Sequence, residues 1–136
     1  MTTNDENEET TMDASTYQAA VERYFAAWNA PDAESRAKAV AAAWTEDGSY
    51  TDPLADVRGH EALTAAITAA REQFPGHEFA HTGEVDGNHD IARFTWDLVS
   101  TADGSSPAAG SDVITLAEDG RIISVKGFLD RVPGAA

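Results

Sequence analysis

The fold is decided by the stretch WTEDGSYTDP at residues 44–53, which is followed by GHEAL at residues 59–63. The first stretch is typical of a helix end, a glycine-containing turn and a short strand, and the second of a new helix. Side chains two positions apart share one face of a strand, so Tyr50 and Asp52 lie together. Pro53 ends the strand because it has no N–H to donate. Asp52 is therefore either a surface acid or a pocket carboxylate.

The composition bounds the class of protein. The chain has 136 residues, 42% of them hydrophobic, with three Trp and no Cys. This predicts one domain with a real core, no disulfide and no thiolate metal site. No apolar run approaches the roughly 20 residues that span a bilayer, so we expect no membrane segment. The polar, acidic N-terminus does not resemble a secretory signal, and we expect a cytoplasmic protein.

The chain is strongly acidic, with 24 acids against nine bases and a formal net charge of −15. Such a surface repels phosphate backbones, and the chain has no basic patch, so we expect no nucleic-acid partner. Residues 1–12 are polar, acidic and aperiodic. We therefore predict a disordered acidic tail at 1–12 and a single domain at 13–136.

Three helices are predicted in the first half of the chain. The first begins near Ser15 and ends before residues 29–32, and one stripe of it carries Tyr17, Val21, Tyr24 and Trp28. The second is Ala-rich, has Asp32 as a plausible N-cap and ends near Trp44. The third spans about residues 60–73 and is stopped by Pro75 and Gly76.

The second half has the character of a sheet. Strands are predicted at residues 77–85, 91–100, 111–117 and 121–130, with hairpin turns at 86–88 and 118–120 and a longer loop at 102–110. Helices followed by strands indicate an α+β fold, in which helices cover one face of a curved antiparallel sheet.

The order of these predicted elements, together with several motifs, resembles that of the nuclear transport factor 2-like superfamily. Within it the chain is most similar to the SnoaL-like proteins, over roughly residues 15–130. The motifs are YFAAWN at 24–29, YTDP at 50–53, GH at 59–60, FPG at 74–76 and DGRI at 119–122. The resemblance implies a cone-shaped fold with a curved sheet around a pocket. It also favours a homodimer through the convex sheet face, where Thr95, Val113 and Thr115 are only mildly polar. The same cone serves isomerases, cyclases and non-enzymes, so the fold does not define the activity.

Comparison with ketosteroid isomerase implies three catalytic residues. That family's general base lies in an Asp-Pro pair, which is matched here by Asp52. Its oxyanion-binding Tyr lies in an Arg-Tyr pair on the first helix, which is matched by Tyr24. A second, protonated Asp precedes the Gly-Arg-Ile turn, and counting back without a gap places Asp112 there.

Each of these residues also has a structural interpretation. Asp52 can accept a proton from carbon, or it can simply form the turn before a proline. Tyr24 can donate its hydroxyl to an oxyanion, or it can be an ordinary core aromatic. Asp112 is either a buried, protonated carboxyl or a solvated residue near a strand end.

Six further residues are candidates for substrate binding, as the wall of a pocket for a flat apolar ligand: Trp28, Trp44, Tyr50, Phe79, His81 and Trp96. Aromatic residues at these spacings also form protein cores. His81 can shuttle protons near neutral pH or serve as a structural histidine. No helical His pair carries an adjacent Glu, so no metal site is predicted.

These observations favour a cofactor-independent enzyme that moves a proton on a small apolar carbonyl compound, such as a polyketide-like or steroid-like ring. Asp52 is the expected base, and Tyr24, with Asp112, stabilises the enolate. The alternative is a non-catalytic ligand-binding or dimerisation module of the same fold. A pocket with converging polar groups favours the enzyme, whereas a pocket filled by side chains favours the module.

Overall fold

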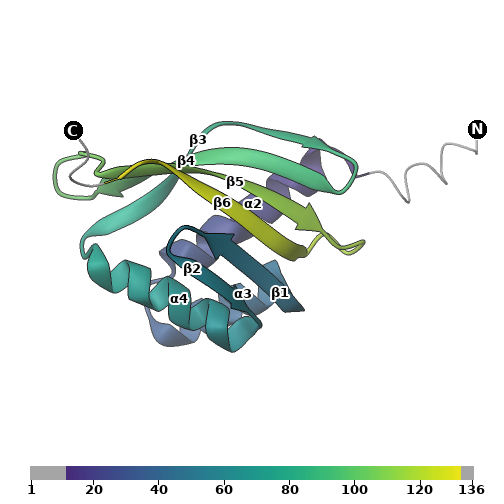
Figure 1. Cartoon of the computed structure of the whole chain (residues 1–136), viewed down its shortest axis with the longest axis horizontal. Helices are drawn as coiled ribbons and strands as arrows, with labels where there is room; N and C mark the ends of the chain where they lie inside the picture. The colour runs from purple at the N-terminus through teal and green to yellow at the C-terminus, as the bar shows by residue number, and fades with distance from the viewer. Residues whose placement is uncertain (1–11, 133–136) are drawn as a thin grey trace, which may run out of the picture.

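The computed structural model describes residues 12–132 as three helices packed against a curved sheet (Figure 1). This confirms the predicted α+β fold. The predicted acidic tail lies outside the described residues, except for Met12. The helices are α2 (Ala14–Asn29), α3 (Ala33–Ala43) and α4 (His60–Gln73). The strands are β1 (Trp44–Asp52), β2 (Ala55–Arg58), β3 (His77–Asn88), β4 (Ile91–Ser100), β5 (Ala108–Leu116) and β6 (Ile122–Arg131).

Side-chain caps and turn residues define the helix ends. The Asp13 carboxylate accepts the Thr16 N–H at 3.0 Å at the start of α2. Asp32 accepts the Ser35 N–H at 2.8 Å in a capping box at the start of α3. Such caps satisfy N–H groups that the first turn of a helix leaves free. The predicted cap at Asp32 is therefore present.

The six strands form one sheet in the order β2-β1-β6-β5-β4-β3. All neighbours are antiparallel except β1 and β6, which run parallel. The helices lie on one face of this sheet (Figure 1). Between the two layers is an apolar core, and its members that are at most 1% exposed include Val21, Val40, Trp44, Leu63, Ile67, Ile114, Ile122 and Val125.

The hairpin turn predicted at residues 86–88 is wrong. Strand β3 continues to Asn88, and the turn lies at His89 and Asp90, where His89 has a φ of 49°. Gly87 pairs with Ala92 inside the ladder, and a Cβ at Gly87 would overlap the Tyr17 ring. The glycine therefore allows a helix side chain to approach the strand rather than forming the turn.

The loop predicted at 102–110 is shorter, because β5 begins at Ala108. This places Asp112 in the middle of a strand rather than near its end. Strand β2 was not predicted; its four residues pair antiparallel with β1 after a tight turn at Pro53.

The outer face of the sheet carries some exposed apolar side chains, with Ile123 42% and Phe128 60% exposed. The homodimer expected on this face stays a prediction. Among the described residues, no helix is long and apolar enough to cross a membrane.

Candidate active site

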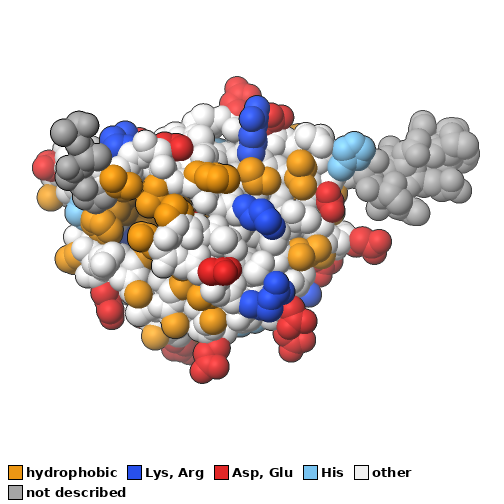
Figure 2. Space-filling model, in the orientation of Figure 1, with side chains coloured by type: hydrophobic (Ala, Val, Ile, Leu, Met, Phe, Trp, Pro, Cys, Tyr) orange, Lys and Arg blue, Asp and Glu red, His pale blue; other side chains and the backbone are white. Residues whose placement is uncertain are grey.

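A cavity of about 330 Å³ lies between the helices and the sheet. In Figure 2, hydrophobic side chains surround a hollow on the left of the displayed face. Aromatic residues from α2, β1, β3 and β4 form much of its wall: Tyr24, Phe25, Trp28, Tyr50, Phe79 and Trp96. Asp52 is the one charged residue that lines this cavity among residues 12–132. The pocket is thus apolar with a single carboxylate in its wall.

Asp52 ends β1 and is half-buried. One of its oxygens, Oδ2, accepts the Tyr50 hydroxyl at 2.6 Å. The other, Oδ1, accepts the backbone N–H groups of Leu54 and Ala55, each at 2.8 Å. The prediction that Tyr50 and Asp52 share a face is therefore confirmed. The carboxylate also forms the turn that leads into β2, as the structural interpretation expected.

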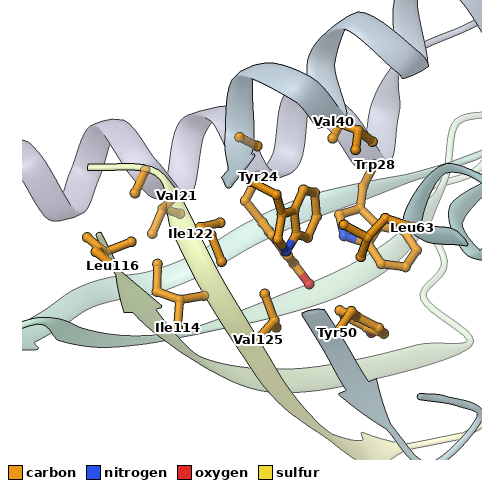
Figure 3. Packing of buried hydrophobic residues seen from close by; sticks show 14 of the residues in the cluster. Val21, Tyr24, Trp28, Val40, Tyr50, Leu63, Ile114, Leu116, Ile122 and Val125 are labelled. Atoms are coloured by element: carbon orange, nitrogen blue, oxygen red, sulfur yellow. The ribbon is translucent and has the colours of Figure 1, made fainter. Parts of the chain in front are cut away.

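Tyr24 and Asp112 form a second pair deeper in the protein. The Tyr24 hydroxyl donates to Asp112 Oδ2 at 2.7 Å, although the two residues lie 88 positions apart. Tyr24 is 2% exposed and Asp112 is 1% exposed. Figure 3 shows Tyr24 in the middle of the buried cluster. Tyr24 lines the cavity, whereas Asp112 is not among the lining residues.

Burial raises the pKa of Asp112 from its ordinary 3.8 to about 7. The hydrogen bond from Tyr24 lowers this pKa, while the negative charge of Asp52 raises it. A buried carboxylate is costly because it loses the hydration of its charge. Near neutral pH, Asp112 therefore exchanges readily between the protonated and the charged form.

Gly127 provides the space for Asp112. It pairs with Asp112 across the β5–β6 ladder, and a Cβ at this position would overlap Asp112 Oδ1. The same Cβ would lie 3.5 Å from the Asp52 Cβ. The two carboxyl groups thus come from strands on either side of β6, with a glycine between them.

The two tyrosine hydroxyls also have shifted pKa values. Burial raises the pKa of Tyr24 and that of Tyr50 well above the ordinary value of 10. The charge of Asp112 contributes to both shifts, which shows that the two acid–tyrosine pairs interact electrostatically. Both hydroxyls remain hydrogen-bond donors throughout the neutral range.

Two predicted binding residues do not line the cavity. Trp44 is completely buried in the core, where its indole N–H donates to the Ser49 carbonyl at 3.3 Å. His81 stacks on Phe25 with a centroid distance of 5.8 Å, and its Nε2 is buried without a hydrogen-bond partner. Trp28, Tyr50, Phe79 and Trp96 do line it.

The structure also identifies residues that the sequence interpretation missed. Asn29 ends α2, and its side chain bonds both the N–H and the carbonyl of Phe79 at 2.9 Å. This pair of hydrogen bonds holds α2, and with it Trp28, against β3. Further missed residues line the cavity: Phe25, Leu54, Ala70, Gln73, Phe74, Leu98, Ala108, Leu129 and Val132. Of these, Phe25 and Phe74 lie within motifs quoted from the sequence, YFAAWN at 24–29 and FPG at 74–76.

The described part of the chain, residues 12–132, brings no three His, Asp or Glu side chains together as metal ligands. The site consists of a cavity-wall carboxylate, two tyrosine hydroxyls and a buried carboxyl group.

Comparison with known proteins identifies the family. A family model described as a SnoaL-like domain matches residues 21–125. A crystal structure of a proposed isomerase of the SnoaL-like family from Agrobacterium tumefaciens is 42% identical, with a TM-score of 0.80, and the match covers 85% of this chain and 98% of that chain. A search of curated proteins finds no match.

Two more distant structures share the fold alone. A proposed SnoaL-like polyketide cyclase from Jannaschia is 22% identical, with a TM-score of 0.70 over 86% of this chain and 87% of that chain. An NTF2-like protein of unknown function from Exiguobacterium is 20% identical, with a TM-score of 0.64 over 82% of this chain and 98% of that chain. The family match and the 42% identical relative show that this chain belongs to the SnoaL-like domain family.

Proposed function

We propose that the protein is a cofactor-independent enzyme that moves a proton on a small, largely apolar carbonyl compound. The observation that carries this proposal is the apolar cavity, which is lined by one carboxylate, Asp52, and by the buried Tyr24. The names of its relatives, a proposed isomerase and a proposed polyketide cyclase, agree with this class of reaction.

In the proposed reaction, the Asp52 carboxylate removes a proton from the carbon next to the carbonyl group. The C–H bond breaks, an O–H bond forms on Asp52, and the electron pair moves onto the carbonyl oxygen as an enolate. The proton then returns to the same carbon or to another one. Such general-base catalysis typically increases the reaction rate by a factor of about 10²–10⁴.

Tyr24 would stabilise the enolate oxygen. In the structure its hydroxyl donates to Asp112, so it is not free for a ligand. When Asp112 is protonated, which its pKa of about 7 permits, its O–H can donate to the Tyr24 oxygen instead. The Tyr24 hydroxyl is then released to donate to the substrate oxygen.

The cavity wall supports an apolar substrate. Its volume of about 330 Å³ suits a molecule with one or two rings. The rings of Trp28 and Phe79 pack edge to face with 4.9 Å between their centroids. The Phe79 and Trp96 rings pack in the same way with 5.3 Å between their centroids. Excluding water from such a wall strengthens the interaction between a hydroxyl donor and a developing negative charge.

The test is exchange of α-protons of 2-tetralone, a bicyclic ketone, for deuterium in D₂O, followed by NMR. We expect the native protein to accelerate this exchange. In Asp52→Asn we expect the acceleration to be about 10²–10⁴-fold smaller. The matched control is Asp56→Asn, since Asp56 is an exposed acid on β2 that does not line the cavity. Unchanged exchange in Asp52→Asn would contradict the assignment of the base.

A second function, ligand binding without catalysis, is favoured by one observation. The Asp52 carboxylate already accepts three hydrogen bonds, an arrangement that also suits a purely structural turn. If the native protein binds 2-naphthol, the aromatic analogue of the 2-tetralone enol, but exchanges no α-protons, the binding module becomes the better account.

A further inference from the structure

Tyr50 lies two residues before Asp52 on the same strand face, and its hydroxyl donates to the carboxylate. We infer that Tyr50 is a positioning residue, which holds the Asp52 carboxylate in the orientation needed to remove the substrate proton. This inference rests on the proposed function. It differs from the sequence-based expectation, in which Tyr50 was part of the substrate-binding wall.

The hydrogen bond between these residues is short, with 2.6 Å between the Tyr50 hydroxyl and Asp52 Oδ2. Hydroxyl-to-carboxylate bonds of this length are among the stronger hydrogen bonds in proteins. Because a tyrosine ring has few rotatable bonds, its hydroxyl is a well-placed donor once the ring is packed. Tyr50 is 5% exposed, and its ring centroid lies 5.5 Å from that of Trp28.

The three donors hold both oxygens of the carboxylate. The N–H groups of Leu54 and Ala55 hold Oδ1, and the Tyr50 hydroxyl holds Oδ2. Within residues 12–132, no Lys or Arg side chain forms an ion pair with Asp52. The orientation of Oδ2 therefore depends on Tyr50, and without it the carboxylate can rotate about its anchored oxygen.

Tyr50 is suited to this role across the working pH range. Its burial and the nearby carboxyl groups of Asp112 and Asp52 raise the pKa of its hydroxyl well above 10. The hydroxyl thus keeps its proton and continues to donate to Asp52. A donor of this kind orients the base without competing with it for the substrate proton.

The test compares Tyr50→Phe with Tyr17→Phe in the 2-tetralone exchange assay. Tyr17 is a matched control, because it is also buried and donates its hydroxyl to one acceptor, the His89 carbonyl, but lies away from the cavity. We expect Tyr50→Phe to lower kcat about 10–100-fold, the cost of a poorly oriented catalytic group, with KM within about twofold of native. Tyr17→Phe is expected to leave both constants unchanged.

Four results would overturn the inference. A native-like kcat in Tyr50→Phe, while Asp52→Asn is inactive, would leave the proposed function intact and remove the role of Tyr50. A change in KM alone would make Tyr50 a substrate contact. A loss of activity accompanied by much greater destabilisation than in Tyr17→Phe, measured by urea unfolding, would make its role structural. No exchange by the native protein would overturn the proposed function and this inference together.

Discussion

The site contains two acid–tyrosine pairs that are chemically alike but lie in different surroundings. Tyr50 and Asp52 lie on one strand at the cavity wall, where Asp52 is half-buried and also bonds two backbone N–H groups. Tyr24 and Asp112 come from α2 and β5, and both are almost fully buried. Burial raises the pKa of the deeper acid, Asp112, to about 7.

This difference shows how burial can give two aspartates different roles. A carboxylate with three hydrogen-bond donors keeps a fixed orientation at the cavity, as a base requires. A deeply buried carboxyl group with one side-chain donor is instead poised to hold a proton, as a hydrogen-bond donor requires. Neighbouring titratable groups in different environments are a common arrangement for acid–base chemistry.

The largest expected effect concerns the pH dependence of stability. The pKa of Asp112 is higher in the folded protein than its unfolded value of 3.8, so the folded state binds more protons between these values. The stability that protonated Asp112 contributes is therefore fully present below pH 3.8, and it is lost as pH rises through about 7. The resulting penalty is roughly 4 kcal/mol at alkaline pH.

The measurement is urea unfolding of native protein and Asp112→Asn at pH 5 and pH 8.5. We expect the native protein to lose about 2–3 kcal/mol more than the variant over this interval, because Asn does not titrate. Equal pH dependence in the two proteins would show that the deep pair does not hold a raised pKa.

A smaller effect is expected when the space between the two carboxyl groups is filled. In Gly127→Ala, the new Cβ would overlap Asp112 Oδ1, which forces the deep pair to move. We expect a loss of about 1–3 kcal/mol in the free energy of unfolding. In an Asp112→Ser background the same substitution should cost less, and a double-mutant cycle measures this coupling. Additive costs would contradict the proposed contact.

The smallest expected effect distinguishes the two tyrosines. The Tyr24 hydrogen bond lowers the pKa of Asp112, so Tyr24→Phe should raise that pKa above about 7. Tyr50→Phe should change it less, because Tyr50 donates to Asp52. Carbon-detected NMR titration of the aspartate carboxyl groups measures both shifts. If Tyr50→Phe raised the pKa of Asp112 more than Tyr24→Phe does, the Tyr24–Asp112 hydrogen bond would not be the one that lowers this pKa.

The sequence predicted those features that depend on local spacing. The stripe of Tyr17, Val21, Tyr24 and Trp28 indicated α2, and alternation placed Tyr50 beside Asp52. Turn residues were less reliable: Gly87 serves close packing within β3, and the actual turn lies at His89. Local patterns do not distinguish a glycine that turns the chain from one that admits a neighbouring ring.

Features that depend on tertiary packing could not be predicted in the same way. Trp44 and Trp28 are both buried aromatics, but only the packing of α3 and β1 decides that Trp44 belongs to the core and Trp28 to the cavity. The Tyr24–Asp112 bond joins a helix to a distant strand. The resemblance placed both residues in one site, whereas their direct hydrogen bond and the space left by Gly127 required the structure.

The central claim is that one cavity presents a carbonyl oxygen to Tyr24 and the adjacent carbon to Asp52. A crystal structure of the protein with 2-naphthol tests it most directly, because this ligand has the shape and polarity of the enol. We predict the naphthol oxygen within hydrogen-bond distance of the Tyr24 hydroxyl and the neighbouring ring carbon against the Asp52 carboxylate. A naphthol oxygen bonded to Asp52, or a ligand bound outside the cavity, would contradict the account.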